Sequence, residues 1–244
     1  FEVYYQPLFR ANAKEHECMG AEALIRWKSA ELGEMQPDEF IPLAEYLGLI
    51  VPIGEHVLRE ACKRCKYWND FGHPEYRINV NLSVVELMQQ NIKTTVGEIL
   101  KETGLDPGHL TLELTESVAA GDTDKLKSAL DGLKELGISL SLDDFGTGYS
   151  SLARLRGLPV DELKIDKVFI DKVGKDDFSD TFVDTVSSLA KSIRLQVVAE
   201  GVEEDIQKDA LSQMKVDLLQ GFFYEKPLPV KEFEAKYVDL PPDE

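Results

Sequence analysis

The 244-residue sequence has little cysteine and no long apolar run. Its three cysteines cannot form a disulfide framework, and the Cys62–Cys65 pair lies in a segment with helical spacing, without a second pair for zinc. We therefore expect partly buried thiols in a reducing cytoplasm. No apolar stretch reaches the roughly 18 residues that a membrane span requires. These absences exclude a disulfide scaffold and predict a domain that does not contact a membrane.

Positive charge is also scarce, with 27 Lys and Arg against 45 Asp and Glu and a formal net charge of −18. This charge would repel a nucleic-acid polymer or an anionic membrane, so we expect neither as a partner. A small anion could bind only where local positive charge outweighs that field. Since the sequence starts at Phe1 inside an apolar run, we expect residues 1–244 to be one domain cut from a longer cytoplasmic or membrane-anchored protein.

Strand-like and helix-like segments alternate along the chain. The strand candidates are rich in β-branched, aromatic or leucine residues and are bounded by turn residues. The helix candidates show apolar residues at spacings of three and four. The strands are expected at 3–9, 18–27, 77–83, 110–116, 138–144, 161–166, 195–201 and 218–224, and the helices at 37–48, 54–70, 85–104, 122–137, 178–194 and 203–214.

Eight strands that alternate with helices over about 250 residues predict a TIM-like (β/α)8 barrel. One connection departs from that pattern, because only residues 10–17 separate the first two strands. A parallel crossover needs a dozen or more residues, so the first strand should run antiparallel to the second. A doubly wound open sheet is the alternative, but no GxGxxG or Walker loop supports it.

Polar residues gather at the predicted C-terminal ends of the strands, where barrel enzymes place their chemistry. Five of them are carboxylates, and the candidate ligands all offer oxygen, a set that suits Mg²⁺ or Mn²⁺ rather than zinc. Each residue alone could be a helix cap, a turn former or a rim salt bridge. Their shared position is the informative feature, and the set is Glu22, Asn81, Glu113, Asp143, Asp144, Lys164, Glu200 and Gln220.

The segment SLSLDDFGTGYSS, residues 139–151, places two carboxylates side by side at a strand end. Asp143 and Asp144 repel each other, so something must compensate them, and Gly146 and Gly148 permit a tight turn against a ligand. With Lys164 and Arg26, five carboxylates sum to about −3, whereas two divalent cations would bring the site to about +1 and attract a phosphate. The sequence thus predicts a two-metal phosphodiesterase site.

Nine motifs in order make the chain resemble the EAL domain family of cyclic di-GMP phosphodiesterases. They are YYQPLF, EALIRW, FIPLAEYLGLI, NVNLS, LELTES, LDDFGTGYSSL, DELKID, VVAEGVE and QGFFYEKPLP. The resemblance covers almost the whole chain and implies a TIM-like barrel that hydrolyses cyclic di-GMP to linear pGpG with Mg²⁺ or Mn²⁺. Calcium should inhibit, because it prefers longer bonds and more ligands. A homodimer and a regulatory domain in the same full-length chain are further expectations.

The resemblance also implies roles for individual residues. Glu116 would hold the DDFGTG loop, which is tied in the family to dimer contacts, and Glu203 would be a further acidic residue near the site. Asp143 would bridge the two metals. The implied catalytic residues are Lys164, Glu116 and Asp144, the substrate-binding residues Arg26, Gln220 and Asp166, and the metal ligands Glu22, Asn81, Glu113, Asp143, Asp144 and Glu200.

Two other functions remain open at this point. A catalytically silent cyclic di-GMP-binding module would be favoured by the loss of a ligand such as Glu22 or Asp143, and the complete set argues against it. An enolase-like barrel enzyme would lack Arg26 together with the DDFGTG loop. The turn at residues 10–20 has no glycine in the turn itself, unlike the family's usual hairpin, but it lies away from the expected ligands.

Overall fold

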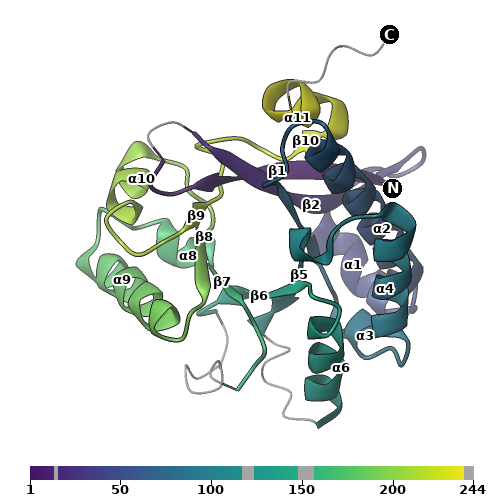
Figure 1. The fold of residues 1–244 in the computed structure, drawn as a ribbon. Helices are drawn as coiled ribbons and strands as arrows, with labels where there is room; N and C mark the ends of the chain where they lie inside the picture. The colour runs from purple at the N-terminus through teal and green to yellow at the C-terminus, as the bar shows by residue number, and fades with distance from the viewer. Residues whose placement is uncertain (14–15, 117–123, 148–156, 239–244) are drawn as a thin grey trace.

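The computed structural model describes residues 1–13, 16–116, 124–147 and 157–238. Eight strands close into a barrel (Figure 1), and β1 completes the ring by pairing with both β2 and β9. Both of these pairings are antiparallel, whereas the other neighbours in the ring run parallel. The barrel and its antiparallel first strand are therefore confirmed. The strands are β1 Glu2–Arg10, β2 Cys18–Ser29, β4 Arg77–Asn81, β5 Leu110–Thr115, β6 Ser139–Phe145, β7 Glu162–Ile165, β8 Gln196–Ala199 and β9 Leu218–Leu219.

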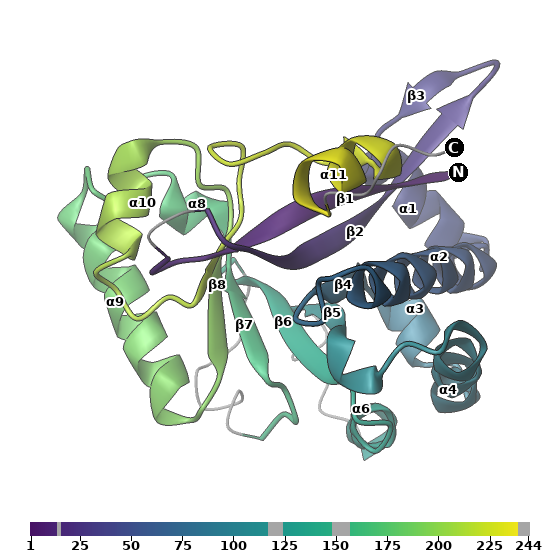
Figure 2. The same ribbon diagram turned by 45° about the horizontal axis from the view of Figure 1, so that its top comes forward.

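Helices surround the barrel, and Figure 2 shows the end of β2 projecting beyond it with β3, Gly33–Met35. The short strand β10, Leu228–Pro229, extends the sheet beside β1. Among the described helices, none has the length and apolar character needed to cross a membrane. They are α1 Pro37–Tyr46, α2 Ile50–Asp70, α3 Val84–Leu87, α4 Ile92–Thr103, α6 Asp124–Lys134, α8 Lys167–Ile170, α9 Asp177–Ser192, α10 Asp205–Leu211, α11 Val230–Tyr237 and the 3₁₀ helix Pro107–His109.

The single helix expected over residues 85–104 is wrong, because the chain forms α3 and α4 there with a break between them. α3 starts at a reciprocal cap in which Ser83 and Glu86 bond to each other's backbone N–H. Residues 89–91 are then exposed in succession, which interrupts the apolar spacing that a continuous helix would need. The expected helix start at Asp122 lies outside the described residues.

Two large apolar clusters fill the space between the strands and the surrounding helices. A third, much smaller cluster is formed by Leu8, Val198 and Leu218, with Met19 packed against it. These three residues come from β1, β8 and β9, so one side of the ring contributes apolar side chains of its own. The polar residues that form the site lie on β1, β2, β4, β5, β6 and β7 and directly after β8 and β9.

Candidate active site

Lys164, on β7, lies among four carboxylates at the C-terminal end of the barrel. Its Nζ is 2.6 Å from Glu200 Oε1, 2.8 Å from Glu113 Oε2, 3.3 Å from Glu22 Oε2 and 3.6 Å from Asp143 Oδ1. The Lys164 side chain is 1% exposed. The four acids come from β2, β5, β6 and the residue after β8, so the barrel brings together groups that are distant in sequence.

Two amides hold the Glu22 carboxylate from either side. Asn81 Nδ2 donates to Glu22 Oε1 at 2.7 Å, and Gln220 Nε2 donates to Glu22 Oε2 at 2.8 Å. Gln220 Nε2 also donates to Gln6 Oε1 at 3.1 Å, so the antiparallel strand β1 contributes to the site. These contacts fix the direction in which Glu22 presents its oxygens.

The cluster has more negative charge than its one ammonium can offset. Burial alone would lower the pKa of Lys164, but Asp143, Glu113, Glu200 and Glu22 together raise it well above its ordinary value. Burial raises the pKa of Glu113, and the neighbouring Glu22 raises it further. Burial likewise raises the pKa of Glu200 to about 8. For Glu22, burial would raise the pKa, but Lys164 and the two amides outweigh it and lower the pKa.

A bulge in β6 explains how Asp143 and Asp144 can both serve the site. Consecutive side chains of a regular strand point to opposite faces. Here the ladder to β7 shifts register between Leu142 and Phe145, and Asp144 has a left-handed φ of 57°. Such a bulge redirects a side chain at the cost of local strain, which functional sites often carry.

Asp144 forms a second acidic pair beside the cluster. Burial raises the pKa of Asp144 to about 6, and the charges of Asp143 and Asp166 contribute to this rise. Asp166 Oδ1 also accepts from Val168 N–H at 2.8 Å and so caps α8. Glu203 instead pairs with Lys167 at 2.6 Å, outside the Lys164 cluster.

Glu116 contacts the loop that follows the two aspartates. Its Oε2 accepts from Gly146 N–H at 2.9 Å. Gly146 has a φ of 102°, and a Cβ there would lie 2.4 Å from the Phe169 ring. The loop is therefore held by a hydrogen bond on one side and by close packing on the other. Gly148 lies outside the described residues.

Arg26 lies apart from the cluster, at the wall of a cavity of about 530 Å³. Its guanidinium is 5.7 Å from the centre of the Tyr4 ring and donates to Ile25 O at 2.8 Å. Asn81 and Glu113 line the same cavity, together with apolar residues of α1 and α2 such as Ile41 and Ile53. The cavity thus joins the acidic cluster to a mostly apolar surface.

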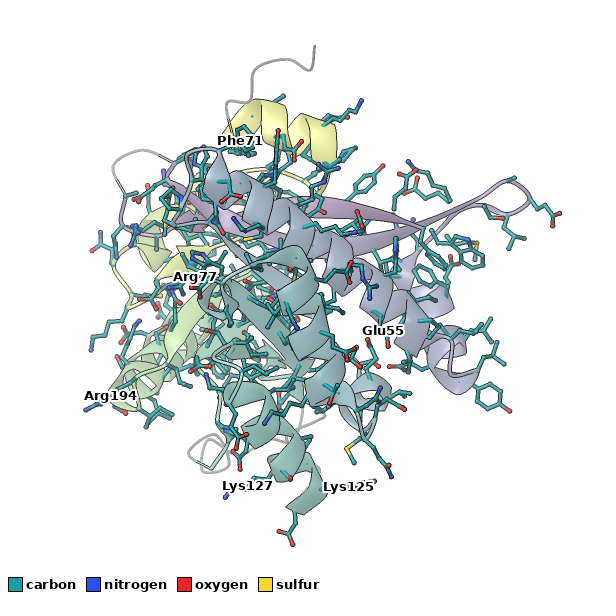
Figure 3. The ribbon with its side chains drawn as sticks, turned by 45° about the vertical axis from the view of Figure 1, so that its right-hand side comes forward. Glu55, Phe71, Arg77, Lys125, Lys127 and Arg194 are labelled. Atoms are coloured by element: carbon teal, nitrogen blue, oxygen red, sulfur yellow. The ribbon has the colours of Figure 1, made fainter. Side chains whose placement is uncertain are left out.

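A larger hollow of about 680 Å³ lies between α4 and α6. Its lining includes Lys125 and Lys127, which project from α6 at the edge of the molecule (Figure 3). None of the predicted site residues lines it. The smaller cavity, which reaches the buried cluster through Glu113 and Asn81, is therefore the candidate site.

The donor set fits a hard divalent cation. Within the described ranges, no three Asp, Glu, His or Cys side chains are arranged as ligands of one metal ion. Oxygens of Glu22, Glu113 and Glu200 contact Lys164 Nζ. The excess negative charge and the all-oxygen donors suit Mg²⁺ or Mn²⁺. Gln220 Oε1 is a buried acceptor that finds no hydrogen-bond partner among the described residues, so it is available to a donor in the site.

Sequence reasoning missed three buried residues that contact the cluster or the residues bonded to it. Gln6 contacts Gln220, and Asn79 donates to Glu113 and reaches Glu162. Asn79 precedes Asn81 by two positions, and Glu162 precedes Lys164 by two. Residues two apart lie on the same face of a strand, so this alternation is the signal that could have found the pair.

The fold and the site define a TIM-like barrel with a buried cluster of carboxylates around one lysine at its C-terminal mouth. The family model for the EAL domain matches residues 1–227, and the chain belongs to that family. The bifunctional diguanylate cyclase/cyclic di-GMP phosphodiesterase MucR of Pseudomonas aeruginosa is 41% identical over 233 residues, which cover 96% of this chain and 34% of MucR. The cyclic di-GMP phosphodiesterase PdeR of Escherichia coli is 36% identical, with coverage of 96% and 35%.

Solved structures agree with this assignment. The structure described as the PaMucR phosphodiesterase in complex with c-di-GMP is 40% identical, with a TM-score of 0.88, and the match covers 95% of this chain and 93% of that one. The resemblance predicted from the nine motifs is thus confirmed. This chain spans about a third of the length of the curated relatives it matches.

We expect the free energy of unfolding of the chelator-treated domain to fall as the pH rises from 5 to 8. Burial raises the pKa of Glu200 to about 8, of Glu86 to about 7 and of Asp144 to about 6, so the folded protein binds more protons than the unfolded chain in this range. Each raised pKa therefore stabilises the fold at low pH and destabilises it as the pH rises. The total loss should amount to several kcal/mol in urea denaturation.

Glu200→Gln removes one of these titrating groups, so its stability should depend less steeply on pH. Thr111→Val is the matched control, because Thr111 is buried in the same barrel without a titrating group, and it should keep the original slope. A wild-type stability that rises between pH 5 and pH 8 would contradict the charge balance described above.

Proposed function

We propose that this domain is a metal-dependent phosphodiesterase that hydrolyses one phosphodiester bond of cyclic di-GMP and releases linear pGpG. The Lys164 cluster is the main support for this proposal. Four carboxylates surround one buried ammonium, and their excess negative charge would attract further cations. Membership of the EAL domain family, the names of MucR and PdeR, and the MucR complex with c-di-GMP support the choice of substrate.

Two divalent cations, when bound, would offset the acidic charge, draw in the substrate phosphate and lower the pKa of a water molecule. Asp143 is suited to contact both cations. Its Oδ1 lies within reach of Lys164 in the cluster and accepts from the backbone N–H of Asp144, the next residue. The residues that would hold the first cation are Glu22, Asn81, Glu113 and Asp143, and those for the second are Asp143, Asp144 and Glu200.

The remaining residues would bind and orient the reactants. Lys164 Nζ has several donors and would orient the attacking water or help to remove its proton. Arg26, at the wall of the cavity, would contact a substrate phosphate and stabilise the charge that develops on it. The apolar wall with Ile41 and Ile53 suits the flat face of a purine base. Gln220 and Asp166 would contact the substrate from the rim.

The greater length of the curated relatives is consistent with a regulatory domain in the same full-length chain. We propose that this domain forms a homodimer through the loop that Glu116 holds. A catalytically silent binding module remains the competing function. It would bind cyclic di-GMP without producing pGpG.

Hydrolysis should require Mg²⁺ or Mn²⁺. Incubation with cyclic di-GMP and either ion, followed by chromatographic separation of the nucleotides, should yield pGpG, and excess chelator should abolish the product. Calcium in place of magnesium should inhibit, because its longer bonds and larger coordination number do not suit a closely spaced pair of metals. Full turnover in chelator would refute metal dependence, and tight nucleotide binding with no product would identify the silent module.

Asp143→Asn and Glu116→Ala should respond differently to added metal. Asp143→Asn removes a bridging charge, so hydrolysis should become undetectable at every Mn²⁺ concentration. Glu116→Ala loses only the bond to Gly146, so turnover should fall roughly 10- to 100-fold and recover in part as Mn²⁺ is raised. Turnover measured against Mn²⁺ concentration separates the two. Equal recovery of both variants, or normal activity of Glu116→Ala at low Mn²⁺, would show that the roles are wrongly assigned.

A further inference from the structure

We infer that Asn79 and Glu162, a buried pair inside the barrel, position the Glu113 carboxylate and thereby prepare the site above them. Neither residue belongs to the set that the EAL resemblance implies. The inference rests on the proposed function of the Lys164 cluster and adds two positioning residues to it.

The contacts place the pair directly against the cluster. Asn79 Nδ2 donates to Glu113 Oε1 at 2.8 Å and lies 3.4 Å from Glu162 Oε1. Asn79 is on β4 and Glu162 on β7, and two strands separate these in the sheet, so their contact crosses the interior of the barrel. The exposed fractions are 3% for Asn79, 5% for Glu162 and 1% for Glu113.

Burying polar side chains such as Asn79 and Glu162 inside the barrel lowers the stability of the fold unless hydrogen bonds compensate for the lost hydration. The interior of a TIM barrel is usually filled by branched apolar side chains, as Leu8, Val198 and Leu218 fill the other side here. A buried carboxylate loses hydration, and burial indeed raises the pKa of Glu162. Well-packed apolar residues would often stabilise such a position equally well. Fold stability therefore gives little reason for an amide and a carboxylate at these two positions.

The chemistry of the pair supplies a reason. An Asn amide can present either its NH₂ or its oxygen, whereas an ionised carboxylate only accepts hydrogen bonds. Glu113 Oε1 and Glu162 Oε1 both lie within reach of Asn79 Nδ2, so the acceptor oxygen of Glu162 favours the orientation in which the NH₂ group faces the two acids. Asn79 in turn holds Glu113 Oε1, which leaves Glu113 Oε2 directed at Lys164 Nζ, 2.8 Å away. Such outer contacts commonly set the direction in which a metal ligand points.

The test uses Asn79→Leu, which keeps the branching at Cγ but removes the donor, with Thr111→Val as the matched control. Thr111 is buried on the neighbouring strand β5, paired in register with Asn79, and its side chain makes no hydrogen bond to Glu113. Asn79→Leu should weaken Mn²⁺ binding, measured by calorimetry, and lower kcat, each by about 10- to 100-fold, with KM for cyclic di-GMP changed less than about 3-fold. Thr111→Val should change none of these by more than about 2-fold.

Glu162→Gln tests the chain of contacts. A glutamine can accept or donate, so the Asn79 amide is no longer held in one orientation, and kcat should fall by about 3- to 10-fold. In the Asn79→Leu background, Glu162→Gln should not lower kcat any further, because Glu162 acts through Asn79. Additive losses in the double variant would show that Glu162 acts independently and would overturn that part of the inference.

The outcomes separate this inference from the proposed function. If wild type hydrolyses cyclic di-GMP and Asn79→Leu retains its kcat and Mn²⁺ affinity, the positioning role is wrong and the function stands. If wild type binds Mn²⁺ without hydrolysis, the function fails, and the Mn²⁺ affinities of the variants still decide the positioning role. If Asn79→Leu only lowers the melting temperature, the pair is structural and the inference is overturned.

Discussion

One buried ammonium among four carboxylates is the constraint on which the rest of this site depends. Lys164 Nζ contacts acids from four other segments of the barrel, and a charge imbalance of this kind is tolerable only if hydrogen bonds and further cations compensate it. The surrounding structure supplies the hydrogen bonds. Asn81 and Gln220 donate to Glu22, and Asn79 donates to Glu113. The closed ring of strands is what brings these groups to one place, because the C-terminal ends of its parallel strands converge there.

Local irregularities then adapt the regular barrel to this chemistry. The bulge at Asp143 and Asp144 lets adjacent residues serve the same rim, and the left-handed backbone of Asp144 is the strain that results. Glu116 and the packing of Gly146 against Phe169 keep the loop after the bulge in place. The antiparallel β1 contributes Gln6, which orients Gln220. Each departure from an ideal parallel barrel thus lies next to a residue proposed to bind metal or substrate.

Much of this architecture could be predicted from the sequence, because the patterns involved are local or depend on chain length. The eight strands follow from short apolar segments bounded by turns, and the antiparallel first strand follows from the brief connection at residues 10–17. The helix break at residues 88–91 and the bulge depend on packing and register, which no local pattern specifies. The Lys164 contacts and the Asn79–Glu162 pair join distant strands across the barrel, so their geometry became visible only in three dimensions.

The central claim is that the acids around Lys164 bind two divalent cations at the mouth of the barrel. Anomalous diffraction from crystals of this domain grown with Mn²⁺ tests it most directly. We expect two manganese peaks roughly 3.5–4 Å apart, ligated by the carboxylates of Glu22, Glu113, Asp143, Asp144 and Glu200. Crystals that show no peak at this rim while Mn²⁺ is bound elsewhere on the protein, or a single peak that leaves Asp144 and Glu200 unligated, would contradict the account.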